Sequence, residues 1–266
     1  MAGDGNVMVV ADLHLDHWLG TGRDPFDGAS CEILASLDAL IIAGDLSNKP
    51  KIRWSKMLTH LGRYVPPQRL HVLPGNHDYY GHVLDGDERL GRICDAVGAN
   101  FAQKRVLVFG GTRYLCCTLW TDFALAGSKE VDMASAAAGM NDYRYIRLER
   151  ARYRRIQPID VARVHADHCA WLEARLAEPF EGRTIVVSHH APLAECVAPG
   201  KSLAPAYASD LSKLIDAYQP NRWLYGHTHR TCSLIRGRTE VRCVSIGYPH
   251  EVSDGVLAAM LGALAR

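Results

Sequence analysis

Short apolar runs separated by polar turns recur along the chain and predict buried β-strands. They cover residues 7–11, 39–43, 70–73, 106–109, 114–119, 184–187, 223–225 and 241–246. Helical patterns lie between many of these runs. The clearest is 159–176, where apolar residues recur at helical spacing after Pro158, a residue tolerated in the first turn of a helix. Weaker helical patterns lie at 31–37 and 211–218.

The order of these elements predicts an α/β fold in a single domain over residues 1–266. Closely spaced strands near 106–119 and 232–246 predict added hairpins that are partly antiparallel. We therefore expect a sandwich of mixed sheets. The segment 121–157 has the least regular pattern and is expected to be an irregular insertion.

Polar side chains follow five of the predicted strands, at the point where each strand ends. They are Asp12 and His14, then Asp45, then Asn76 with His77 and Asp78, then His189 with His190, and finally His227 with His229. Loops beyond the carboxyl ends of strands in an open α/β sheet meet at one crevice. These side chains are therefore expected to share one site.

Seven of these residues offer metal-ligand atoms: Asp12, His14, Asp45, Asn76, His189, His227 and His229. A set of oxygen and nitrogen donors without thiolate suits Mn, Fe, Zn or Co. Seven ligands exceed the needs of one catalytic ion. Shared between two ions by a bridging Asp, they leave positions for water and substrate, which is the arrangement used for displacement at phosphorus. Glycines precede three of the ligand blocks and predict tight turns or close approach of the backbone: Gly44, Gly75 and Gly226.

The composition limits the class of protein. With 48% hydrophobic and 22% charged residues the chain can bury a large core, and its formal charge of +1 argues against nucleic acid or an anionic membrane as a partner. The start of the chain lacks the pattern of a secretory signal, and the apolar stretch 256–265 is too short to span a bilayer. Eight scattered cysteines without a CxxC pair suit reduced thiols. We expect a soluble, cytoplasmic protein.

The polar blocks closely resemble the five-block signature of the calcineurin-like metallophosphoesterases. They read Asp12-Leu13-His14, Gly44-Asp45, Gly75-Asn76-His77-Asp78, Ser188-His189-His190 and Gly226-His227-Thr228-His229. One block alone is a weak signal, but five in this order at strand ends, spanning residues 9–229, are specific. The resemblance implies a four-layer α/β/β/α sandwich with two mixed sheets, and hydrolysis of phosphate esters.

The resemblance also implies a role for each residue of the blocks. One metal ion would be held by Asp12, His14 and His229, the other by Asn76, His189 and His227, with Asp45 between them. His77 would donate a proton to the leaving group, and Asp78 would orient His77. The nucleophile implied is a hydroxide that bridges two divalent or mixed-valence transition metal ions.

Three positions need separate interpretation. Asn48 stands where many relatives carry an Asp, so we expect altered hydrogen bonding around the metals and not their loss. Adjacent residues of an extended segment point to opposite sides, so if His189 is the ligand, His190 points away from the metal. His190 is then interpreted either as a residue that contacts the ligands or the substrate, or as a hydrogen-bonded buried histidine. Arg144, in the run Asn-Asp-Tyr-Arg, is a candidate to bind a substrate phosphate, although the basic run that follows it is also typical of a solvated surface.

These observations favour a metal-dependent phosphatase or phosphodiesterase acting on small molecules. One alternative is a nuclease on strand ends, which needs a basic groove or a capping domain. Another is a non-catalytic, metal-binding scaffold of the same fold, in which loss of ligands or of His77 is expected. The sequence leaves open the choice between mono- and diesters, the metal pair and the oligomeric state.

Overall fold

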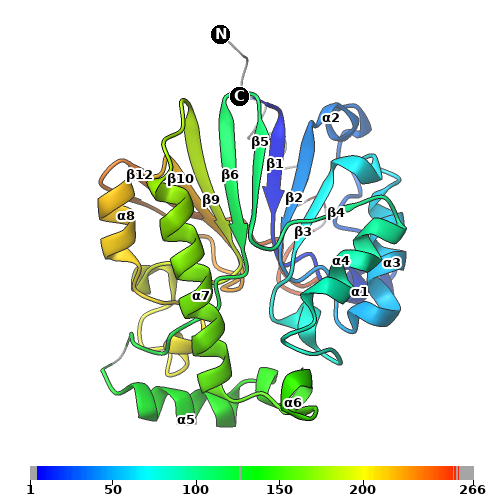
Figure 1. Cartoon of the computed structure of the whole chain (residues 1–266). Coiled ribbons are helices and arrows are strands. Elements are labelled where there is room, and N and C mark those ends of the chain that lie inside the picture. The colour runs from blue at the N-terminus through cyan, green and yellow to red at the C-terminus, as the bar shows by residue number, and fades with distance from the viewer. Residues whose placement is uncertain (1–4, 126, 254, 256, 258–266) are drawn as a thin grey trace.

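Two β-sheets lie face to face at the centre of the molecule, in a computed structural model that describes residues 5–125, 127–253, 255 and 257 (Figure 1). The four-stranded sheet has the spatial order β1 (Val7–Val10), β2 (Ala39–Ala43), β3 (Leu70–Leu73) and β4 (Asn100–Phe101). The six-stranded sheet has the order β11 (Ser233–Arg236), β12 (Thr239–Cys243), β10 (Arg222–Tyr225), β9 (Arg183–Ser188), β6 (Thr112–Cys117) and β5 (Arg105–Phe109). A two-stranded sheet pairs β7 (Arg147–Leu148) with β8 (Arg154–Arg155).

Strand direction differs between the two large sheets. The pairs β1–β2, β2–β3 and β3–β4 are parallel. In the six-stranded sheet the central strands β12, β10, β9 and β6 are parallel, whereas β11 and β5 are added at the edges in antiparallel hairpins. The expected hairpins near 106–119 and 232–246 are confirmed.

The helices are α1 (Leu15–Gly20), α2 (Cys31–Ser36), α3 (Pro50–Leu61), α4 (Asp87–Ala96), α5 (Lys129–Gly139), α6 (Asp142–Tyr145), α7 (Pro158–Ala177) and α8 (Ser212–Tyr218). Short 3₁₀ turns are η1 (Pro67–Arg69), η2 (His77–Tyr79), η3 (Glu149–Ala151), η4 (Ala194–Cys196) and η5 (Ala204–Ala206). Figure 1 shows α7 and α8 beside the six-stranded sheet, and α3 and α4 beside the four-stranded one.

Alternation along the strands explains the four layers. In β1, Met8 and Val10 belong to the apolar core shared with α3 and α4, whereas Val9 belongs to a second core that includes Ile185 of β9. Successive side chains of a strand point to opposite faces, so β1 faces a helix layer on one side and the other sheet on the other. A third core packs the six-stranded sheet against α7 and α8, including Leu172. The predicted α/β/β/α sandwich is confirmed.

The segment 121–157 is more regular than the sequence indicated. It contains α5, α6 and the β7–β8 pair, so the expectation of an irregular insertion was wrong for much of its length. The reason is that α5 is rich in alanine, which forms helices without an apolar stripe, and Ser128 caps it by accepting from the amide of Val131. Figure 1 shows α5 and α6 below the strands, at the end toward which β1 points.

The apolar stretch 256–265 lies outside the described residues, apart from Leu257. Within the part of the chain that the structure describes, no helix combines the length and apolar character needed to cross a bilayer.

Candidate metal centre

The loops that leave the carboxyl ends of the strands hold their polar residues in unusual backbone conformations. Five of these residues have positive φ angles: Asp12 at 55°, His14 at 41°, Asp45 at 58°, His227 at 67° and His229 at 49°. Such angles are uncommon outside glycine and cost free energy, so they persist only where the surroundings enforce them. Their concentration at the strand ends marks this edge of the sandwich as the candidate site.

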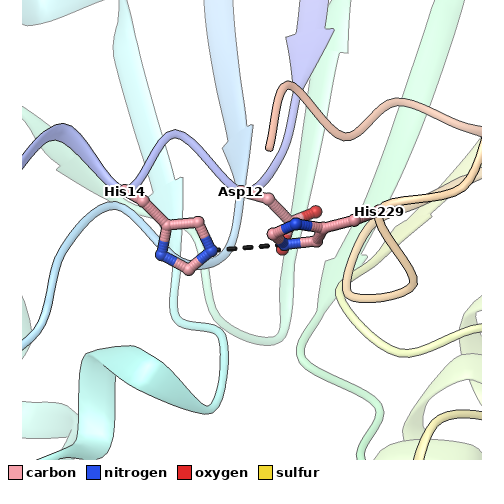
Figure 2. A group of neighbouring side chains, drawn as sticks. All are labelled: Asp12, His14 and His229. Atoms are coloured by element: carbon pink, nitrogen blue, oxygen red, sulfur yellow. Dashed lines mark hydrogen bonds and ion pairs between the residues drawn. The ribbon is translucent and has the colours of Figure 1, made fainter. Parts of the chain in front are cut away.

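Asp12, His14 and His229 form a first group of ligand atoms (Figure 2). His229 Nε2 lies 3.3 Å from Asp12 Oδ1 and 3.3 Å from His14 Nε2. The other oxygen of Asp12, Oδ2, accepts hydrogen bonds from the amide of His227 and from the hydroxyl of Ser245. Oδ1 is therefore the oxygen left to face the two imidazoles, and Figure 2 shows the three side chains directed toward one another.

A second group contains Asp45, His189 and His227. Nδ1 of His189 donates to the carbonyl of Ala43 at 2.9 Å, which leaves the lone pair of Nε2 directed into the group. Asn76 joins it, because Oδ1 of Asn76 lies 3.1 Å from that Nε2.

Asp45 lies between the two groups. One of its oxygens, Oδ1, is 3.5 Å from Nε2 of His189, and the other, Oδ2, is 3.8 Å from Nε2 of His14. Each oxygen thus faces a different group. His14, Asp45 and His77 also form a candidate ligand set, so His77 lies at the same place.

The electrostatics of the site favour cations. Two buried carboxylates, Asp12 and Asp45, lie together, and burial with the charge of Asp12 raises the pKa of Asp45 well above its usual value. Oδ1 of Asp12 and Nε2 of His227 are buried without a hydrogen-bond partner among the described residues. Buried acceptors without donors are costly, and a divalent cation with oxygen and nitrogen ligands would satisfy them. The residues present therefore fit such an ion.

Two carboxylates orient side chains of these groups. Glu251 accepts from Nδ1 of His229 at 2.7 Å. The buried carboxylate of Asp142 accepts from Nδ2 of Asn76 at 2.9 Å and so turns Oδ1 of Asn76 toward His189. Neither Asp142 nor Glu251 was identified from the sequence. The run Asn-Asp-Tyr-Arg contains Asp142, but its pattern draws attention to Arg144 as the phosphate-binding candidate.

Close backbone approach explains two of the glycines. A Cβ atom on Gly75 would lie 2.2 Å from Oδ1 of Asp45, and one on Gly44 would lie 2.3 Å from Nδ1 of His189. Any side chain at either position would displace a ligand, as the sequence interpretation anticipated.

The family model for calcineurin-like phosphoesterases matches residues 5–231. The chain belongs to this family. An uncharacterised protein of Acanthamoeba polyphaga mimivirus is 24% identical over 273 residues, covering 91% of each chain. The crystal structure of phosphopantetheinyl hydrolase from Mycobacterium tuberculosis superposes with a TM-score of 0.72 at 21% identity, covering 94% of this chain and 92% of the other. These comparisons indicate a metal-dependent phosphoesterase and confirm the fold.

Asp78 does not orient His77, which corrects the role inferred for it in this phosphoesterase. Nδ1 of His77 instead lies 3.1 Å from Oδ1 of Asn48. The carboxylate of Asp78 is buried and accepts from four backbone amides and from Nε1 of Trp54. Asp78 therefore ties the loops after β2 and β3 together, which positions Asp45 indirectly.

Neither His190 nor Arg144 lines the cavity over the metal groups, so neither occupies the position expected for a substrate contact there. His190 is buried behind the ligands, with its ring centroid 4.3 Å from that of His227 and its Nδ1 3.3 Å from the carbonyl of Thr118. It matches the interpretation as a hydrogen-bonded buried histidine. Arg144 is exposed and lines a neighbouring cavity, not the one over the metal groups.

A cavity of about 300 Å³ opens over the two groups. Tyr80, Tyr207 and Tyr248 line it with aromatic surface. Lys201 adds a cation, and its Nζ lies 3.4 Å from the ring centroid of Tyr207. His77 also lines the cavity, and burial together with the charge of His189 lowers the pKa of His77 to about 3.

Proposed function

We propose that this chain is a dinuclear metal-dependent phosphoesterase that hydrolyses phosphate mono- or diesters of small molecules. The observation that carries the proposal is the position of Asp45, whose Oδ1 faces His189 while Oδ2 faces His14. In the proposed assignment Asp12, His14 and His229 hold one ion, and Asn76, His189 and His227 hold the other. Mn, Fe, Zn and Co all suit these donors.

Two such ions would offset the negative charge of the phosphate and lower the pKa of a water molecule at the site. The chain itself would supply the proton for the leaving oxygen from His77, which lines the cavity. A phosphate ester brings negative charge next to this imidazole and raises its pKa from the low value of the substrate-free protein. Lys201 would add a cation at the wall of the cavity.

The aromatic wall supports an organic ester as substrate. Tyr207 and Tyr248 offer apolar ring surface to the part of the substrate beyond the phosphorus. The Mycobacterium tuberculosis neighbour is named a phosphopantetheinyl hydrolase, which makes phosphopantetheinyl esters reasonable substrates to test. The eight cysteines are all unpaired, which supports the proposed cytoplasmic location.

The test compares p-nitrophenyl phosphate with bis-p-nitrophenyl phosphate. Metal-stripped protein is reconstituted separately with Mn, Zn, Co and Fe, and bound metal is counted by mass spectrometry. We expect about two ions per chain and turnover of at least one ester that stripping abolishes. Absence of turnover with two ions bound would favour the scaffold alternative, and binding of one ion would overturn the dinuclear assignment.

A further inference from the structure

A second cavity, of about 680 Å³, lies beside the cavity over the metal groups. Its walls carry four basic side chains, Lys49, Arg53, Arg144 and Arg147, and we call it the basic groove. The side chains come from three segments: the loop and helix after β2, α6, and the start of β7. A concentration of cations in one concave surface attracts anions more strongly than the same charges dispersed over a surface.

The basic groove has a surplus of positive charge. Asp16 is the acidic residue of its wall, and it already pairs with Arg53. Among the described residues, no carboxylate pairs with Lys49, Arg144 or Arg147. Within the described part of the chain, the guanidinium of Arg144 makes two long hydrogen bonds, of 3.5 Å to Oδ1 of Asn141 and 3.4 Å to the carbonyl of Ala138. Its guanidinium therefore keeps most of its donors for an anion.

The basic groove and the cavity over the metal groups share a wall. Tyr80 lines both cavities. Its ring centroid lies 4.4 Å from that of His77 on the metal side and 5.4 Å from that of Tyr145 on the groove side. Asn48, which lines the groove, contacts His77 through the hydrogen bond described above. The two cavities are therefore neighbours, separated by the side chain of Tyr80.

The backbone holds this arrangement together. The amide of Lys49 donates to the carbonyl of Tyr80 at 3.1 Å, and the amide of Gly81 donates to the carbonyl of Tyr145 at 3.1 Å. The helix α3 begins directly after Lys49 without an acidic residue in its first turn, so its positive end adds to the charge of the groove. The three segments that carry the cations are thus linked before any ligand binds.

We propose that the basic groove binds a second anionic group, a phosphate or pyrophosphate, carried by the same molecule whose ester is hydrolysed at the metal centre. The substrate class is then a small phosphate ester with a further phosphate at a set distance. This inference rests on the proposed phosphoesterase function and narrows its substrates. Arginine suits the role because its planar guanidinium can bond two phosphate oxygens at once.

The first experiment uses diol bisphosphates of increasing length, from ethanediol to hexanediol, as a ruler. Each is compared with the alkyl monophosphate of the same length on the metal-reconstituted protein. We expect kcat/KM of the best bisphosphate to exceed that of its monophosphate by about tenfold or more. The ratio should peak at one length, because the groove and the metal centre are a set distance apart.

Variants test which side chains produce the ratio. Arg144→Gln combined with Arg147→Gln should lower the ratio toward one, and Lys49→Gln should lower it independently if the double variant folds poorly. Arg155→Gln is the matched control, because Arg155 is an exposed arginine of the same segment that lines neither cavity. It should leave the ratio unchanged. A ratio near one in the unmodified protein would overturn the proposal.

A binding measurement separates this proposal from the proposed function. Metal-stripped protein is titrated with pyrophosphate by calorimetry, and we expect binding that the double variant weakens about tenfold. Turnover of p-nitrophenyl phosphate without pyrophosphate binding or a bisphosphate preference overturns the groove proposal alone. Pyrophosphate binding without turnover of any ester overturns the phosphoesterase and, with it, the substrate class. Faster cleavage of a single-stranded oligonucleotide, with steep salt dependence, overturns the small-molecule substrate.

Discussion

His77 and Asn48 are joined by a hydrogen bond of 3.1 Å between the imidazole Nδ1 and the amide Oδ1. Nδ2 of Asn48 donates to Asp16 at 3.2 Å, which determines that Oδ1 faces the imidazole. Nδ1 of His77 therefore carries a proton, and Nε2 is the nitrogen left to exchange one with a substrate. The neutral amide of Asn48 thus orients His77. An aspartate at this position would also place a negative charge beside the imidazole.

Replacing Asn48 by leucine removes this acceptor at similar volume. We expect the kcat for alkyl phosphates to fall by about tenfold to a hundredfold, with a smaller loss for p-nitrophenyl phosphate, because proton donation matters most when the leaving oxygen is basic. His77→Ala should show the same dependence with larger losses. The measurement is kcat across esters of graded leaving-group basicity, with metal content as the control. Equal losses for all leaving groups would contradict the role of His77.

Asp142 should determine how well Asn76 serves as a ligand. In Asp142→Leu the amide of Asn76 loses its carboxylate partner and keeps a long contact of 3.5 Å to the hydroxyl of Tyr80, so we expect metal affinity to fall by about tenfold to a hundredfold at one of the two sites. Asp142→Asn retains Oδ1, the atom that accepts from Asn76, and should keep most of the affinity. Competition with a chromogenic chelator measures both variants. Unchanged affinity in the leucine variant would exclude this positioning role.

Asp45→Asn should weaken both ions together. Its two oxygens face separate groups, and the substitution removes the negative charge that both ions would share. His14→Ala is the comparison, because it removes a ligand from one group and should release one ion only. Metal stoichiometry after dialysis distinguishes the two results. Retention of two tightly bound ions in Asp45→Asn would refute the bridging assignment.

His168 should make folding stability depend on pH. Its Nδ1 accepts from the amide of Leu119 at 3.1 Å, and burial lowers the pKa of His168 to about 3. In the unfolded chain a histidine has a pKa of about 6.5. Between these values the unfolded state binds a proton that the folded state does not. The unfolding free energy therefore falls by about 1.4 kcal/mol for each unit of pH below 6.5, and this contribution is constant above it.

Urea unfolding between pH 7 and pH 5 measures this dependence. His168→Gln should be less stable at pH 7 but should reduce the slope by about one proton. His250→Gln, at an exposed histidine, is the matched control and should keep the full slope. An unchanged slope in His168→Gln would show that the buried imidazole is not responsible.

The elements found from the sequence were those with strong local patterns. The fully buried run ALIIA of β2 and the long amphipathic helix α7, with its capping box at Gln157 and Asp160, are examples. The helices α3 and α4 and the short strand β4 were missed, whereas β11 was expected only as part of a hairpin near 232–246. α3 places Trp54, Leu58 and Leu61 on one face among many polar residues, and β4 has only two residues. Such patterns are too weak without the packing that completes them.

The sequence by itself determined the α/β class, the polar residues that follow five strands and the seven ligand candidates, because these depend on local hydrophobic periodicity and on residue type. Only the tertiary structure decided the partners of each side chain. Asn48 rather than Asp78 meets His77, Asp142 orients Asn76, and Arg144 lies in a groove shared with Lys49. These contacts join segments far apart in the chain, and their distances depend on how the two sheets and α6 pack, which no local pattern records.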